Sequence, residues 1–144
     1  MYPAPFRGAS FIKAESQPAP YSSTAPAPML RREFCVGAFK TARLAVLPLG
    51  IGVFYINGKP VTEDIFLCSA NNYTEHLWYH KYDVTSLLRV GTNTISVLLG
   101  NGFFNEALPL PWEFAAAPFR DAPSLLLSLS VDGETLLVSD SSFK

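Results

Sequence analysis

The sequence is poor in cysteine, in net charge and in long apolar runs, and each shortage excludes a class of protein. Its 144 residues include only Cys35 and Cys68, too few for a disulfide framework. The 11 basic and 12 acidic residues are well mixed, so no basic stripe is available for nucleic acid or an anionic membrane. The longest apolar stretch, residues 44–56, is too short for a membrane span and contains Pro48.

The two cysteines lie in apolar, strand-like runs and are expected to be small buried hydrophobic side chains. Whether they pair stays open, because a disulfide needs Cα atoms within about 7 Å of each other. The first residues carry no basic region followed by an apolar run, so no signal peptide is expected in this chain.

Familiar catalytic and metal-binding motifs are also missing. His76 and His80 are four residues apart. On a strand they would lie about 13 Å apart, too far for one zinc ion, whose bonds to nitrogen are about 2 Å. Gly100 and Gly102 match only part of a phosphate-loop pattern, and there is no nucleophile elbow or convincing acidic cluster for calcium. We therefore expect no cofactor, no metal, and surface or interface positions for both histidines.

The carboxylates do not suggest a catalytic pair. Cleavage of a glycosidic bond usually needs two carboxylates about 5 to 10 Å apart. Glu106, Glu113 and Asp121 share one long loop, but nothing in their spacing brings them together. Solvated loop charges are the favoured interpretation, and no catalytic residue is predicted. A small enzyme acting through Glu106 and Glu113 is a weaker alternative.

What the sequence does contain is a series of short strand-like segments. Residues 29–36 alternate in polarity, and residues 42–50 are apolar on both parities, which indicates a central strand. The dipeptides Asn57-Gly58 and Asp132-Gly133 tolerate positive φ and indicate tight hairpins. The segment 73–84, which is rich in aromatic residues and contains Thr74, is also typical of a strand.

Further segments complete an all-β pattern. A short helical turn over 83–93 would be capped by Asp83 and ended by Gly91, before a strand over 94–100. About eight strands with almost no helix predict an antiparallel jelly-roll β-sandwich over residues 29–144. Residues 1–28 hold six of the 12 prolines and are expected to form an extended segment, within which 9–14 could add an edge strand.

One loop, residues 99–123, collects five large aromatics, four prolines and three acids. A loop of this length runs over the surface, so its rings cannot all belong to the core. They could form a lid on the core, dock onto a neighbouring domain, or contact a sugar directly. The candidate interface or sugar-contact residues are Asn101, Phe103, Phe104, Asn105, Glu106, Trp112, Glu113 and Phe114.

The order of motifs resembles the N-terminal β-sandwich domain of bacterial α-L-rhamnosidases of the glycoside hydrolase family 78 type. The resemblance spans residues 9–144 and is carried by "ASFI", "RREFCV", "ARLAVLPLGIGVFYINGKPV", "HKYDVTSLL", "GTNTISVLLGNGFF" and "VSDSSFK". Phe11, Phe103 and Phe143 stand where that family tends to have tryptophan, and Asn101 replaces an acid. Each change to phenylalanine keeps the apolar ring and removes a polar group, which suits packing better than sugar recognition.

The resemblance implies a galactose-binding-like β-sandwich that precedes other β domains and an (α/α)6 barrel with the catalytic acids. These 144 residues do not contain that barrel, so the chain is expected to be a non-catalytic accessory domain partnered by other domains of the same enzyme. That enzyme would hydrolyse terminal α-L-rhamnose from glycosides, with inversion, in a bacterial cytoplasm or periplasm. The alternatives are an independent carbohydrate-binding module, with a rhamnose-containing glycan as partner, and a structural adhesion domain.

Overall fold

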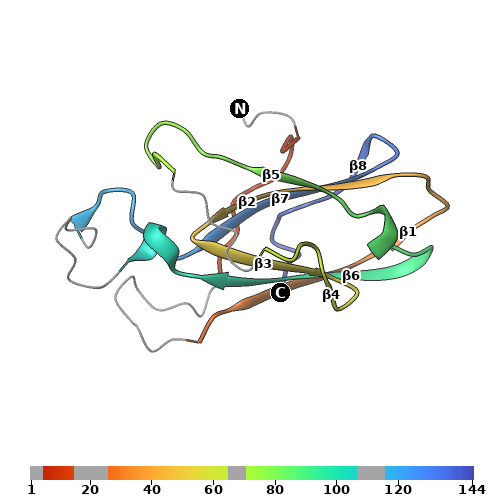
Figure 1. Cartoon of the computed structure of the whole chain (residues 1–144), viewed down its shortest axis with the longest axis horizontal. Helices are drawn as coiled ribbons and strands as arrows, with labels where there is room; N and C mark the ends of the chain where they lie inside the picture. The colour runs from red at the N-terminus through yellow and green to blue at the C-terminus, as the bar shows by residue number, and fades with distance from the viewer. Residues whose placement is uncertain (1–4, 15–25, 65–70, 107–115) are drawn as a thin grey trace.

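The computed structural model describes residues 5–14, 26–64, 71–106 and 116–144, and shows two four-stranded antiparallel sheets packed face to face (Figure 1). The first sheet has the order β1-β6-β3-β4 and the second β5-β2-β7-β8. The predicted antiparallel β-sandwich is confirmed. The elements are β1 (Met29–Val36), β2 (Ala42–Leu49), β3 (Ile51–Ile56), β4 (Lys59–Pro60), β5 (His80–Asp83), η1 (Thr85–Leu87), β6 (Gly91–Gly100), η2 (Gly102–Asn105), β7 (Ser124–Val131) and β8 (Glu134–Val138), where η marks a 3-10 helix.

Two tight hairpins set the register of neighbouring strands, as their turn sequences predict. Asn57 and Gly58, between β3 and β4, have φ values of 52° and 77°. Asp132 and Gly133, between β7 and β8, have φ values of 50° and 89°. Positive φ at both central positions gives a turn whose twist matches that of the strands.

The main core lies between the two sheets and uses alternate residues of each strand. On β1 the predicted alternation is confirmed: Leu30, a member of this core, and Val36, of the same parity, are both 5% exposed. On β2, Leu44 and Val46 are completely buried. The other buried members of this cluster are Ala42, Phe54, Ile56, Val84, Leu88, Ile95, Val97, Leu99, Leu125, Leu127, Leu129 and Leu137.

The outer face of the second sheet is covered by the N-terminal segment. Phe6 is completely buried there, and Ile12 makes an isolated bridge to Leu125 of β7 through backbone hydrogen bonds of 3.0 and 2.9 Å. This covering explains why β2, an interior strand as predicted, is apolar on both parities. The buried residues of this second cluster are Phe6, Ala9, Ala45, Leu47 and Leu126.

The strand predicted over 73–84 is wrong for its first part. The carbonyl oxygen of Asn72 accepts the amides of Glu75 (3.0 Å) and His76 (2.9 Å), which closes a turn before β5 begins at His80. The Asn72 side-chain oxygen also accepts the Thr74 hydroxyl at 2.8 Å and the Thr74 amide at 3.4 Å. An asparagine side chain that forms such local bonds favours a turn over a strand despite the aromatic residues around it. His76 and His80 therefore do not share a strand.

The predicted helical turn over 83–93 needs a smaller correction. The N-cap of η1 is Val84 and not the predicted Asp83, although the Asp83 carboxylate accepts the amide of Thr85 at 3.0 Å. In addition, η1 ends at Leu87, and Gly91, with φ of 95°, begins β6 instead of ending the helix.

Cys35 is exposed and not buried as expected, because it lies on the outward parity of β1. Cys68 lies outside the described residues.

Two hydrogen-bonded amide side chains, Asn57 and the buried Asn93, tie the β3–β4 hairpin to the start of β6. Asn93 is completely buried, and its Oδ1 accepts Asn57 Nδ2 (2.8 Å) and the amide of Arg89 (3.0 Å). Its Nδ2 donates to the carbonyls of Arg89 (2.7 Å) and Gly91 (2.9 Å). Asn57 Oδ1 accepts the amide of Thr94 at 3.0 Å. The Asn93 side chain is thus fully hydrogen-bonded, which makes its burial favourable.

Candidate functional site

One end of the sandwich brings together segments that are distant in sequence (Figure 1). The helix η2 follows the last residue of β6, and residues 116–121 precede β7. We call the described residues 101–106 and 116–121 the lip. The turn before β5 contacts the lip through Tyr73, whose ring lies 5.1 Å from that of Phe104.

The lip contains a small aromatic cluster. Tyr73 also lies 4.7 Å from Phe119, and the Phe104 and Phe119 rings are stacked with centroids 6.3 Å apart. Phe104 is only 5% exposed, whereas its neighbour Phe103 is 49% exposed. Within the lip, Phe104 is therefore buried in the aromatic cluster, whereas the adjacent Phe103 ring lies at the surface.

The lip rests on the turn between β2 and β3 through direct backbone contact. Gly50 has φ of 103°, and a Cβ there would lie 2.3 Å from the carbonyl oxygen of Gly100 and 2.9 Å from that of Asn101. Gly102 has φ of 52°, and its Cβ would lie 3.3 Å from the Cα of Gly50. Only glycine permits both the positive φ and this close approach. The base of the lip is thereby fixed relative to both sheets.

The lip also contains a buried amide with one unmet acceptor. Asn105 is 7% exposed; its Nδ2 donates to Asn101 Oδ1 at 3.0 Å and its backbone amide to the Asn101 carbonyl at 3.2 Å. Among the described residues no donor reaches Asn105 Oδ1. Such an orphan acceptor is costly unless something else satisfies it, and so it marks the lip as a place where a partner group would be stabilising.

The structure brings together only some of the predicted site residues. Asn101, Phe104 and Asn105 lie in contact with one another or with the aromatic cluster, Phe103 faces the surface, and Glu106 is partly buried at the end of η2. Asp121 forms an exposed ion pair with Lys13 at 3.0 Å. The remaining candidates, Trp112, Glu113 and Phe114, lie outside the described residues.

Metal and membrane sites find no support in the described part of the chain. There, no three His, Cys, Asp or Glu side chains gather closely enough to hold a metal ion. The side chain of His76 is 82% exposed, and His80 stacks on Tyr82 with centroids 6.3 Å apart. No helix among these residues has the length and apolar character needed to cross a membrane.

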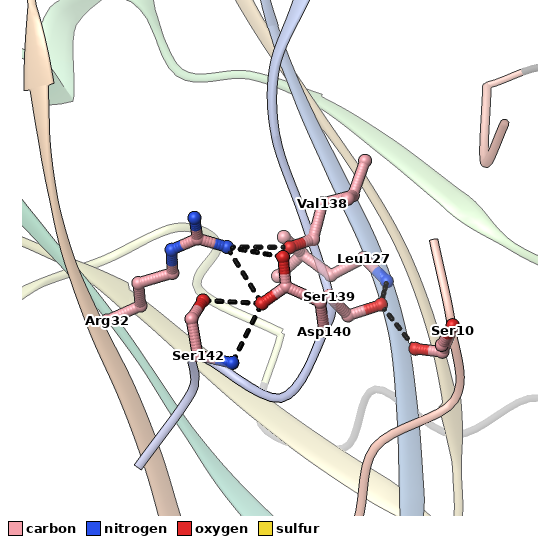
Figure 2. Close-up of polar contacts among 7 residues, drawn as sticks. All are labelled: Ser10, Arg32, Leu127, Val138, Ser139, Asp140 and Ser142. Carbon is pink, nitrogen blue, oxygen red and sulfur yellow. Dashed lines mark hydrogen bonds and ion pairs between the residues drawn. The ribbon is translucent and has the colours of Figure 1, made fainter. Parts of the chain in front are cut away.

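A polar network that the sequence did not reveal joins the two sheets, and Figure 2 shows its geometry. Arg32 Nη1 on β1 donates to both carboxylate oxygens of Asp140 at 3.1 Å and to the carbonyl of Val138 at 3.1 Å. Asp140 also accepts the amide of Ser142 at 2.9 Å and its hydroxyl. We call these four residues the clasp. The available signal was Arg32 itself, a charged residue on the inward parity of an alternating strand.

Ser139, next to the clasp, attaches the N-terminal segment to the second sheet (Figure 2). It is completely buried; its hydroxyl donates to the carbonyl of Ser10 at 2.7 Å and accepts the amide of Leu127 at 3.0 Å. The Ser10 amide in turn donates to the Ser139 carbonyl at 2.8 Å. One side chain thus links β7, the chain after β8 and the segment that carries Phe6.

We expect the free energy of unfolding to fall when the pH is lowered below about 4. The Thr41 and Lys40 amides hold the pKa of the Asp132 carboxyl below its ordinary value, and the Ser142 hydroxyl and amide do the same for Asp140. Their stabilisation is fully present above the unfolded-state pKa of about 3.9 and is lost as the pH falls through the lower folded-state values.

Urea midpoints measured from neutral to strongly acidic pH would check this dependence. In the Asp132→Asn variant the midpoint should vary less with pH in the acidic range, because one of the stabilised carboxylates is gone. Glu134→Gln, an exposed change on the neighbouring strand, is the matched control. A variant at Asp132 with the full pH dependence of the original protein would contradict the assignment.

The fold and the lip define a class: a β-sandwich module whose loops at one end form a small aromatic cluster beside an exposed ring. The chain belongs to the family of α-L-rhamnosidase N-terminal domains, since the model of that family matches residues 37–144.

Relatives and solved structures agree with this membership. An α-L-rhamnosidase of Streptomyces avermitilis is 28% identical over 116 residues, which is 79% of this chain and 11% of the relative. The crystal structure of an Aspergillus terreus α-L-rhamnosidase superposes with a TM-score of 0.82 at 30% identity, covering 96% of this chain and 16% of that one. An α-L-rhamnosidase of Dictyoglomus thermophilum gives a TM-score of 0.78 at 27% identity, covering 97% and 16%. The chain therefore spans about a sixth or less of the relatives it matches.

Proposed function

We propose that this chain is the non-catalytic N-terminal accessory domain of an α-L-rhamnosidase that hydrolyses terminal α-L-rhamnose from glycosides. The observation that carries the proposal is the family match over residues 37–144 in a chain that covers only 16% of its structural relative from Aspergillus terreus. Other domains of the same polypeptide would supply the catalytic acids. This chain would contribute a rigid surface instead of a reacting group.

We propose that the lip packs against those other domains and helps to shape the substrate cleft. Phe103 is 49% exposed, yet it belongs to a helix whose base is fixed by the backbone contact at Gly50. A large ring held in a rigid position loses little conformational entropy when it is buried by a partner. Trp112, Glu113 and Phe114 of the same loop would extend this surface.

Substitutions in the full-length enzyme test the role of the lip. We expect Phe103→Ala, and the double change Trp112→Ala with Phe114→Ala, to lower kcat/KM for an aryl rhamnoside about tenfold or to lower the unfolding temperature, because an interface anchor is typically worth 1–2 kcal/mol or more. Leu136→Ala, at a side chain 43% exposed on β8, is the matched control and should have neither effect. Unchanged stability and activity in both lip variants would refute the proposal.

The size of the native protein tests the accessory-domain assignment itself. An antibody raised against this chain should detect a polypeptide several times longer than 144 residues in source cells. A native product of only 144 residues would exclude catalysis by further domains of the same chain.

A second candidate function, an independent carbohydrate-binding module, is favoured by one observation. Trp78 is 67% exposed, and the Asn71 side chain accepts its backbone amide at 2.7 Å, so its position is restrained. An exposed indole is a suitable surface for stacking on a sugar ring. This function requires millimolar or tighter binding of L-rhamnose by the isolated chain, lost in Trp78→Ala and measured by calorimetry. Absence of binding would exclude this second function.

A further inference from the structure

The outer edge of β1 offers hydrogen-bonding groups that the sandwich itself does not pair with a strand. β1 is the first strand in the order β1-β6-β3-β4, so β6 occupies only one of its edges. The Leu99 amide donates to the Pro28 carbonyl at 3.0 Å, which assigns residues of even number to the β6 side. Because this direction alternates along an antiparallel strand, the backbone groups that point away from β6 are those of Met29, Arg31, Glu33 and Cys35.

Lys144 already occupies one position of that outer edge. The Arg31 amide donates to the Lys144 carbonyl at 2.7 Å, and the Lys144 amide donates to the Arg31 carbonyl at 2.9 Å. Two reciprocal bonds of this kind define a hydrogen-bonded pair of an antiparallel ladder. The pair fixes the register: Met29 lies opposite the second residue after Lys144, and Glu33 lies opposite Ser142.

The clasp restricts strand pairing along the outer edge of β1 to one direction, from Arg31 towards Met29. The Ser142 amide is used by the Asp140 carboxylate at 2.9 Å, so residues 140–143 form a turn and do not pair with Glu33. The Phe143 amide donates to the Asp140 carbonyl at 3.3 Å, and the Arg32 guanidinium lies 5.9 Å from the centre of the Phe143 ring. These contacts hold Lys144 beside Arg31 at the outer edge of β1.

We infer that the outer edge of β1 is the binding site for the segment that follows Lys144 in the parent enzyme, which continues as an added edge strand towards Met29. This inference rests on the proposed function, which places further domains after this one. The segment is a better occupant than a strand from a second copy, because Lys144 holds it beside the edge at high effective concentration and in a fixed register. An added strand would also protect an edge that otherwise invites aggregation.

The direction of the added strand has a consequence for domain arrangement. It runs antiparallel to β1 and passes Met29, which pairs with Leu98 of β6. Leu98 lies two residues before Gly100, where β6 ends at the base of the lip. The chain would therefore leave the sandwich at the same end as the lip. The next domain would begin there, close to the lip surface that is proposed to contact it.

Amide hydrogen exchange on the full-length enzyme, resolved to single residues by mass spectrometry, tests this inference. The Met29 amide should exchange at least about tenfold more slowly than the Glu33 amide, a ratio equivalent to ~1.4 kcal/mol of opening free energy. Glu33 is the internal control, because its amide points to the same edge but lies opposite the turn. The Arg31 amide, already paired with Lys144, should also be slow.

Each other outcome would overturn the inference. Equal, fast exchange at Met29 and Glu33 would show that no strand is added. Equal, slow exchange would show that something covers the whole edge without the predicted register. Protection of Met29 that appears only as the protein dimerises at high concentration would assign the edge to a second copy.

The same sample separates this inference from the proposed function. If the enzyme cleaves an aryl rhamnoside while Met29 exchanges rapidly, the function holds and the added strand is wrong. If Met29 is selectively protected in a protein without rhamnosidase activity, the added strand holds and the function is wrong.

Discussion

Replacement of Gly50 by alanine is expected to destabilise the domain by about 4 kcal/mol and to displace the lip. The new Cβ would lie 2.3 Å from the Gly100 carbonyl oxygen and 2.9 Å from that of Asn101, so backbone would have to move. The residue would also have to adopt φ of 103°, which costs a residue with a side chain a further 1–3 kcal/mol or so. Urea denaturation followed by tryptophan fluorescence would measure the loss.

Gly100→Ala is the matched control for this prediction. Gly100 lies in the same contact, but its φ is not in the left-handed region, and a Cβ there would lie 3.4 Å from Ile51 Cβ, an ordinary contact. We expect this change to alter stability by no more than about 1 kcal/mol. Similar effects of the two alanines would mean that the close backbone approach does not determine the position of η2.

Replacement of Asn93 by alanine is expected to cost about 3 kcal/mol, because it removes a buried side chain that serves several backbone groups. The Arg89 amide and the carbonyls of Arg89 and Gly91 would lose their bonds to this side chain, and Asn57 Nδ2 would keep only its bond to the Leu87 carbonyl. The free energy of unfolding, measured by urea denaturation, should fall with little change in the m value.

Two further variants sharpen the test at Asn93. Asn93→Asp keeps an acceptor for Asn57 Nδ2 but turns an oxygen towards the carbonyls of Arg89 and Gly91, so it should be at least as harmful as alanine. Thr92→Ala, at the exposed neighbouring position, should stay within about 0.5 kcal/mol of the original protein. A tolerated aspartate would show that the two donor bonds contribute little.

The fold could be predicted where local chemistry determines it. The Asn57-Gly58 and Asp132-Gly133 turns require positive φ that their residues tolerate, and the parity of β1 follows from its alternation. The first part of the predicted strand over 73–84 failed because the Asn72 carbonyl closes a turn, a local competition that aromatic content does not reveal.

Long-range packing set the limit of prediction for β2. Its two apolar faces correctly indicate an interior strand, but they do not say what covers the second face. That cover is Phe6, which packs with Leu126 from the far end of the sequence. No periodicity within either segment connects them.

For the candidate site, too, local composition was predictive, whereas long-range packing could not be predicted. The composition of the loop over 99–123 correctly places part of it at the surface, as Phe103 shows. The division between exposed Phe103 and buried Phe104 depends on Tyr73 and Phe119, which approach from other segments. The clasp between Arg32 and Asp140 likewise joins residues separated by more than a hundred positions, and only their charges hinted at it.

The N-terminal segment that covers the second sheet also shows how the cooperative folding unit differs from the part of the chain that the family model matches. The family match begins at residue 37, after β1 and after the segment that buries Phe6. A protein starting at that point would leave β6 with an unpaired edge and the second sheet with a bare apolar face. Residues 37–144, the part that the family model matches, are thus less than one cooperative folding unit, and the residues before them complete it.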